Sequence, residues 1–126
     1  MIGEYPFRSG KLKVDGYGTI RTTSSKVKNE QKMHQHIIDA DKLPKDAVWR
    51  YRREGDTFAP LGLGGTKKLK EYFIDKKIPQ RMRDEIPVLA TGNQILAVAD
   101  IEIADCLKVT DETKQLYKIN YEKDLV

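Results

Sequence analysis

The sequence has few of the residues on which catalytic and covalent chemistry usually depend. It contains one cysteine and two histidines in 126 residues, and 8% of its residues are aromatic. A single cysteine, Cys106, cannot form an internal disulfide and fits a reducing compartment. The longest uncharged apolar run, Ile95 to Ala99, is far shorter than the ~20 residues of a membrane helix, and no basic-then-apolar leader opens the chain. We therefore expect one small cytoplasmic domain that does not associate with membranes.

The candidates for catalysis or metal binding lack the partners that such chemistry requires. His34 and His36 alternate on one face of an expected strand, but no cysteine or carboxylate stands at zinc-like spacing from them. Cys106 has no neighbouring base, which favours a small buried thiol. Asp39 and Asp41 precede a proline-containing stretch and are typical of a turn. The sequence predicts neither a catalytic residue nor a metal site.

Positive charge is concentrated in the middle of the chain. Residues 50–83 carry ten basic and four acidic side chains, a net charge of +6, whereas residues 1–49 carry +3 and residues 84–126 carry −5. A basic segment of this kind is what the electrostatic footprint of a polyanion-binding protein looks like. The alternative is a solvated face that the acidic last third balances.

The apolar patterning predicts an α+β class: a small, mostly antiparallel sheet or sandwich with two short helices inserted mid-chain. The first third is polar and punctuated by glycine, and it predicts a loose hairpin around a turn at 15–18 with a mobile loop over 22–31. Gly92-Asn93 is a short-hairpin signal between two apolar runs. The expected strands are 34–38, 47–53, 88–91, 94–99, 100–104 and 115–119, with a turn at 40–46.

The expected strand that contains Trp49 has two chemically different faces. Because side chains alternate along a strand, Trp49, Tyr51 and Arg53 share one face, whereas Arg50 and Arg52 share the other. We expect the aromatic face to point inward and the face with Arg50 and Arg52 to point to solvent.

Two short helices are expected after this strand. Helical spacing begins at Thr66, a candidate N-cap, and places lysines on one flank of the helix. Pro79 suits the first position of a second helix, which Pro87 ends. Arg81 and Arg83 point away from its apolar seam. The residues expected in the core are Leu69, Tyr72, Phe73, Met82 and Ile86.

The glycine-rich loop before the first helix does not match a nucleotide-binding motif. A Walker loop needs glycine directly before its lysine and serine or threonine after it, whereas Thr66 precedes Lys67 and Lys68 follows. A dinucleotide loop needs a glycine where Lys67 stands. ATP binding by this chain is therefore not expected. Two interpretations stay open for Gly64, Gly65 and Thr66: a loop whose N–H groups approach one phosphate, or a plain tight turn.

Nucleic acid is the class of partner that would use all of these basic residues. Contacts with phosphate and ribose position an RNA without reading its sequence. The basic segment has no aromatic stacking platform, so a helical stem is favoured over a single strand. Phe58 could stack on a base end, but its position in an apolar run favours the core. The predicted contact residues are Arg50, Arg52, Lys67, Lys68, Lys70, Arg81 and Arg83.

The chain from residue 50 onward resembles the C-terminal domain of tRNA(Ile)-lysidine synthetase. The resemblance covers 39–104 best, is strongest over 39–88, and is loose over 1–32. The matching pieces follow one another in the family's order: Arg50, Arg52 and Arg53 leading into Gly55-Asp56, then Pro60-Leu61-Gly62, Gly65 to Lys70, Phe73-Ile74-Asp75, Ile78-Pro79, Arg83-Asp84 and Pro87-Val88.

The resemblance implies that residues 1–126 are a single tRNA-binding C-terminal domain with no catalytic residue and no cofactor of its own. In that bacterial family the whole ligase uses ATP and Mg²⁺ to attach lysine to the wobble cytidine of an isoleucine tRNA with a CAU anticodon. The chemistry belongs to an N-terminal domain whose Ser-Gly-Gly-X-Asp-Ser loop is absent from this sequence. The implied partners are tRNA, held by its body including the acceptor stem, and the catalytic domain of the same protein.

Within this resemblance Asp56 is expected to be structural, capping a turn or orienting Arg53, since a carboxylate would repel RNA. The alternative function is a protein-interaction or dimerisation module that orients the catalytic domain, with the basic segment facing an acidic partner; the oligomeric state stays open. A stand-alone hydrolase would need a nucleophile and a base that the sequence does not provide.

Overall fold

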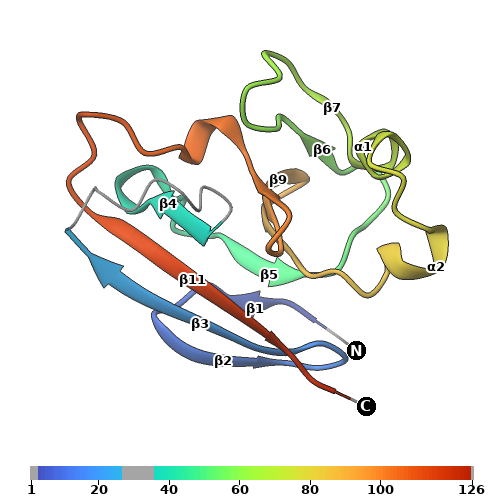
Figure 1. The fold of residues 1–126 in the computed structure, drawn as a ribbon, viewed down its shortest axis with the longest axis horizontal. Helices are drawn as coiled ribbons and strands as arrows, with labels where there is room; N and C mark the ends of the chain where they lie inside the picture. The colour runs from blue at the N-terminus through green and yellow to red at the C-terminus, as the bar shows by residue number, and fades with distance from the viewer. Residues whose placement is uncertain (1–2, 27–35, 126) are drawn as a thin grey trace.

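The computed structural model describes residues 3–26 and 36–125, in which two β-sheets face one another and short helices lie at one end (Figure 1). Among the described residues, every strand pair is antiparallel except β6 with β9. The larger sheet has the order β1 (Tyr5–Pro6), β5 (Val48–Arg50), β8 (Val88–Thr91), β9 (Gln94–Val98), β6 (Thr57–Phe58) and β7 (Lys67–Lys68), with β10 (Glu102–Ile103) also paired to β9. The smaller sheet has the order β2 (Gly10–Val14), β3 (Gly18–Ser25), β11 (Leu116–Lys123) and β4 (Ile37–Asp39).

Two helices and two short 3-10 turns complete the described part of the chain. They are α1 (Leu69–Asp75), α2 (Gln80–Arg83), η2 (Ala40–Lys42) and η3 (Asp105–Leu107). The α+β class with a mostly antiparallel sandwich and two short helices is therefore confirmed. No helix in the described ranges is long and apolar enough to cross a membrane.

The larger sheet is apolar on both faces because a separate core covers each of them. Leu89 faces the smaller sheet, in a cluster that contains Trp49 and Ile119, whereas Val88 and Ala90 face a second cluster built with α1. This alternation follows from the two-residue period of a strand. The second cluster fixes α1 against the sheet and so places the residues at the start of this helix.

Several expected elements have the predicted positions. The hairpin around residues 15–18 is present as β2 and β3, and Gly92-Asn93 joins β8 to β9. Asp39 and Asp41 shape a turn as predicted, because Asp39 Oδ1 accepts a hydrogen bond from Asp41 N at 2.9 Å. Phe58 is fully buried, as expected. Residues 34 and 35 of the strand predicted at 34–38, and 27–31 of the predicted loop, lie outside the described residues.

Other boundaries were wrong where pairing between distant segments decides the structure. Residues 22–25 extend β3 and are not a mobile loop, because they pair with β11. The strand predicted at 47–53 ends at Arg50. Thr66 is not an N-cap, since Lys67–Lys68 pair with β6 as β7 and the helix begins at Leu69.

The predicted core is right for α1 and partly wrong for α2. Leu69, Tyr72 and Phe73 are buried, and Ile86 packs against the same cluster. Met82 is 40% exposed, because α2 has only four residues and turns this side chain away from the sheet. Cys106 is also misplaced: it is predicted as a buried thiol but is exposed, since η3 buries its neighbour Leu107 instead.

Candidate nucleic-acid interface

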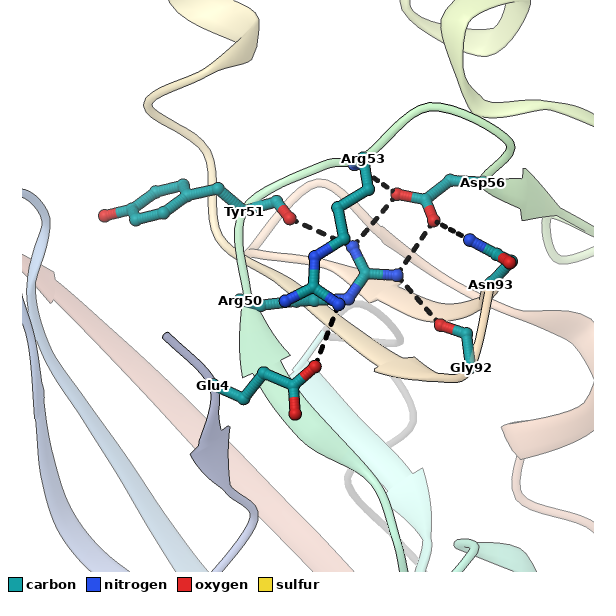
Figure 2. A network of polar contacts seen from close by, with 7 residues as sticks. All are labelled: Glu4, Arg50, Tyr51, Arg53, Asp56, Gly92 and Asn93. Atoms are coloured by element: carbon teal, nitrogen blue, oxygen red, sulfur yellow. Dashed lines mark hydrogen bonds and ion pairs between the residues drawn. The ribbon is translucent and has the colours of Figure 1, made fainter. Parts of the chain in front are cut away.

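A buried ion pair anchors the loop that follows β5. The Arg50 side chain donates to both carboxylate oxygens of Asp56, at 3.0 and 2.8 Å, and to the carbonyl oxygens of Tyr51 and Gly92, at 2.9 and 2.8 Å (Figure 2). Arg50 is 1% exposed and Asp56 is 3% exposed. A buried guanidinium needs such partners, because an unpaired buried charge is very costly.

This burial corrects the prediction that Arg50 contacts RNA. β5 is an interior strand of the larger sheet, paired on one side with β1 and on the other with β8. Arg50 is 1% exposed, so the protein covers this side chain and it does not point to solvent as expected. The guanidinium of Arg50 donates its hydrogen bonds to Asp56, Tyr51 and Gly92, and these bonds hold the loop after β5 in place.

Asp56 closes the turn formed by residues 53–56. Its carboxylate accepts from Arg53 N at 2.7 Å and from Asn93 Nδ2 at 3.2 Å, while its own N donates to the Arg53 carbonyl at 3.2 Å. Gly55 supplies the positive φ of +90° that this turn requires. The expectation that Asp56 caps a turn is confirmed, and the side chain with which it forms an ion pair is Arg50.

Burial on its own would raise the pKa of the Asp56 carboxyl. The hydrogen bonds from Arg50, Arg53 and Asn93, together with the Arg50 charge, outweigh burial and lower this pKa below its ordinary value. Asp56 is therefore ionised at neutral pH, and its charge is compensated inside the protein.

The anchored loop forms one wall of a cleft of about 570 Å³. Three of the predicted contact residues meet there, although they come from the loop, from β7 and from α1: Arg52, Lys68 and Lys70. The remaining lining residues are Arg53, Glu54, Gly55, Asp56, Thr57, Leu69 and Asp84. A hydrogen bond from Leu69 N to the Asp56 carbonyl, at 2.9 Å, ties the two walls together.

The alternation of side chains in β7 separates its two lysines. Lys68 lines the cleft and forms no ion pair with another described residue, whereas Lys67 lies outside the cleft lining and pairs with Asp75 of α1. Lys70, in the first turn of α1, is exposed and lines the cleft. Lys68 and Lys70 are therefore available to a ligand, while Lys67 is engaged by the protein.

The other predicted contacts lie outside the cleft lining. Arg81 is exposed on α2, and Arg83 is half-buried with its Nε donating to the Ile78 carbonyl at 2.9 Å. The loop residues Gly64, Gly65 and Thr66 are exposed and lead into β7. The picture of a glycine loop opening directly into a helix N-terminus is therefore wrong, because a strand stands between them.

Three charged residues of the cleft are not among the predicted ones: Arg53, Glu54 and Asp84. Arg53 was assigned to the inward face, but β5 ends before it, and its exposed guanidinium pairs with Glu4 at 2.9 Å (Figure 2). Asp84, at the C-terminal cap of α2, accepts from Arg52 Nε at 2.8 Å. No local signal connects Asp84 with Arg52, which lies 32 residues earlier.

The cleft therefore combines four cationic side chains with three carboxylates, of which Asp56 is neutralised by Arg50. This arrangement can bind a ligand that carries both negative charge and hydrogen-bond donors. Within the described ranges, no group of three or more His, Cys, Asp or Glu residues could hold a metal ion.

Comparison with known proteins places most of the chain in one family. The family model described as the TilS substrate C-terminal domain matches residues 47–120. The tRNA(Ile)-lysidine synthase of Caldanaerobacter subterraneus subsp. tengcongensis is 44% identical over 88 residues, which are 70% of this chain and 19% of that protein. The synthase of Persephonella marina is 36% identical over 109 residues, which are 86% of this chain and 24% of that protein. The chain spans about a fifth of the length of these curated relatives.

One solved structure supports the same assignment, and a second shares the fold. A crystal structure of a TilS C-terminal domain superposes with a TM-score of 0.76 and 25% identity, covering 94% of this chain and 96% of that one. An N-terminal fragment of the phenylalanyl-tRNA synthetase β-subunit from Pyrococcus horikoshii has a TM-score of 0.60 at 14% identity, over 93% of this chain and 46% of that one, and shows the fold alone. The resemblance noted in the sequence is thus confirmed, and the chain belongs to the family of tRNA(Ile)-lysidine synthase C-terminal domains.

Proposed function

We propose that this domain binds the substrate tRNA for a tRNA(Ile)-lysidine synthase, and that its cleft is the centre of the binding surface. The observation that carries the proposal is the convergence of Arg52, Lys68 and Lys70 from separate segments on one cleft. Phosphate and ribose contacts of this kind hold an RNA in position without reading its sequence.

The remaining predicted contacts extend the surface. Lys67, Arg81 and Arg83 would meet phosphates beyond the cleft, with Lys67 exchanging Asp75 for a phosphate, and the loop at 64–66 would approach the backbone of the RNA. We assign the acceptor-stem region of the tRNA to this surface. Arg50 is excluded because it is buried.

The chemistry of the proposed enzyme resides outside this domain. A separate catalytic domain of the same cytoplasmic protein would use ATP and Mg²⁺ to convert the wobble cytidine of the CAU-anticodon isoleucine tRNA to lysidine, and the present domain would hold no cofactor. Its contribution is to hold the right tRNA while that reaction proceeds.

The test is the salt dependence of tRNA binding by the 126-residue chain and a Lys68→Ala/Lys70→Ala variant. Each lost phosphate contact reduces the magnitude of the slope of log K against log salt concentration by about one. We therefore expect the Lys68→Ala/Lys70→Ala variant to bind every tRNA more weakly, with a slope whose magnitude is smaller by about two. The matched control is Lys11→Ala/Lys13→Ala on edge strand β2 of the other sheet, which also removes two exposed lysines. Equal affinity and slope for the cleft variant and the parent chain would overturn the proposal.

The alternative function, an interaction module that orients the catalytic domain, is favoured by two exposed apolar side chains on the helices. Ile74 is 54% and Met82 is 40% exposed. An interaction module predicts a molar mass that rises with protein concentration in light scattering, or capture of the catalytic domain, in the absence of tRNA affinity at low salt.

A further inference from the structure

The guanidinium of Arg52 is held in place on two sides before any ligand arrives. Its Nε donates to Asp84 at 2.8 Å, and its Cζ lies 5.9 Å from the centroid of the Phe73 ring. Phe73 is fully buried in the second core cluster, so the surface beneath the guanidinium is rigid. The Arg52 side chain retains 22% exposure. A flat cationic surface is therefore fixed at the wall of the cleft.

The size of the cleft restricts what can lie on that surface. Its volume of about 570 Å³ falls in the range of roughly 300–1,000 Å³ that is typical of small-molecule sites. A nucleotide is a ligand of this size, whereas an intact duplex offers only its outer backbone to such a cleft. The cleft thus suits one nucleotide that has left the stack.

The charges around the cleft favour a nucleotide over a simple anion. Lys68 and Lys70 form no ion pair with another described residue and can face a phosphate. Glu54 and Asp84 also line the cleft and would repel an isolated anion, but carboxylates accept hydrogen bonds from the amino groups of bases. A ligand that carries a base as well as a phosphate can therefore interact favourably with both the lysines and the carboxylates of the cleft.

We propose that the cleft binds one unpaired nucleotide of the bound RNA, with its base stacked on the Arg52 guanidinium and its phosphate facing Lys68 and Lys70. Guanidinium planes stack on unpaired bases in RNA-binding proteins. The hold of Phe73 and Asp84 on Arg52 reduces the ordering cost of binding. This inference rests on the proposed tRNA-binding function and adds a single-stranded element to the helical stem that the sequence favoured.

The decisive variant is Arg52→Lys, which keeps the charge and removes the planar surface. The probe is a single-stranded tetraribonucleotide that carries 2-aminopurine, a base whose fluorescence is quenched by stacking. Base stacking by one side chain changes affinity by roughly 5- to 150-fold, so we expect Arg52→Lys to weaken binding of the probe at least five-fold and to abolish the quenching. Its salt slope should stay unchanged because the charge is kept.

The matched control is Arg53→Lys, the same substitution at a neighbouring cleft arginine that pairs with Glu4 instead of packing on an aromatic ring. It should change the affinity for the probe less than two-fold. Circular dichroism of both variants establishes that the sandwich is intact. A blunt-ended RNA duplex, which offers no unpaired base, should lose less affinity for the Arg52→Lys variant than the tetranucleotide does.

Three outcomes would overturn the inference. The first is that Arg52→Lys quenches the probe as much as the parent chain does. The second is that the Arg52 and Arg53 variants lose equal affinity for the probe. The third is that free adenosine monophosphate displaces the probe at the same concentration as an unlabelled tetranucleotide, which would make the cleft a free-nucleotide site. If Arg52→Lys binds and quenches the probe as the parent chain does, while Lys68→Ala/Lys70→Ala has a reduced salt slope, the stacking is refuted. The proposed tRNA-binding function is then still supported.

Discussion

Asp56→Ala tests whether the buried ion pair anchors the loop that carries Arg52. The substitution removes the acceptor of two Arg50 hydrogen bonds, at 3.0 and 2.8 Å, and the cap on Arg53 N. It leaves the Arg50 guanidinium buried, with only the carbonyl oxygens of Tyr51 and Gly92 as partners.

Breaking a buried ion pair in this way costs about 3–5 kcal/mol of unfolding free energy. For a domain of this size, that loss corresponds to a decrease of roughly 10 to 20 °C in Tm. Urea and thermal denaturation followed by circular dichroism measure both quantities. The matched control is Glu4→Ala, which breaks the half-exposed pair with Arg53 and should cost below about 1 kcal/mol.

A double-mutant cycle separates the pair from its surroundings. Arg50→Met in the Asp56→Ala background should cost much less than Arg50→Met alone, because the charge that it removes has already lost its partner. The reasoning is refuted if Asp56→Ala costs no more than Glu4→Ala, or if the two losses at Arg50 and Asp56 simply add.

The same pair predicts how stability depends on pH. The pKa of Asp56 is lowered in the folded protein, so its contribution is complete above the pKa of the unfolded chain and is lost as the pH falls through the folded value. The difference in stability between the parent chain and Asp56→Ala should therefore be constant from about pH 5 to 8 and shrink below about pH 4. A difference that grows as the pH falls would contradict this sign.

Two further comparisons test the packing of the fold. Tyr72→Phe removes a 2.6 Å hydrogen bond from the buried Tyr72 hydroxyl to Glu102 and should cost about 1.5–3 kcal/mol in urea denaturation, as expected for a hydrogen bond to a charged acceptor; an unchanged midpoint would contradict the bond. Gly18→Ala should lower Tm far more than Gly64→Ala. Both glycines have positive φ, but a Cβ at residue 18 would overlap the β11 backbone, whereas a Cβ at residue 64 would meet open space. Equal decreases in Tm would show that the close approach to β11 is unimportant.

Local patterns carried much of the correct prediction. The hairpin at Gly92-Asn93 needs a tight turn between two apolar runs, and both features are adjacent in the sequence. The apolar stripe of Leu69, Tyr72 and Phe73 is set by the helical repeat alone, and all three residues are buried. The residues that link the chain to its family likewise follow one another along the sequence, so the family was visible before the fold.

Long-range pairing decided the features that the patterns missed. The helical repeat predicts Thr66 as an N-cap. Lys67–Lys68 instead pair with β6, a strand about ten residues earlier in the sequence, and a helical repeat cannot reveal this pairing. Arg53 does not follow the alternation of a strand, because β5 ends at Arg50. The ion pair between Arg50 and Asp56 holds the following residues in a loop.

The sequence by itself determined the class of the domain, its family and the concentration of positive charge between residues 50 and 83, because each depends on composition or on neighbours along the chain. Only the tertiary structure decided which of those charges face solvent. Arg50 and Arg52 stand two residues apart and have the same chemistry, yet one is buried against Asp56 and the other lines the cleft beside Asp84. The physical reason is that the cost of burying a charge depends on the partners that folding brings to it, and Gly92 and Asp84 reach these arginines only when the sheet and α2 are in place.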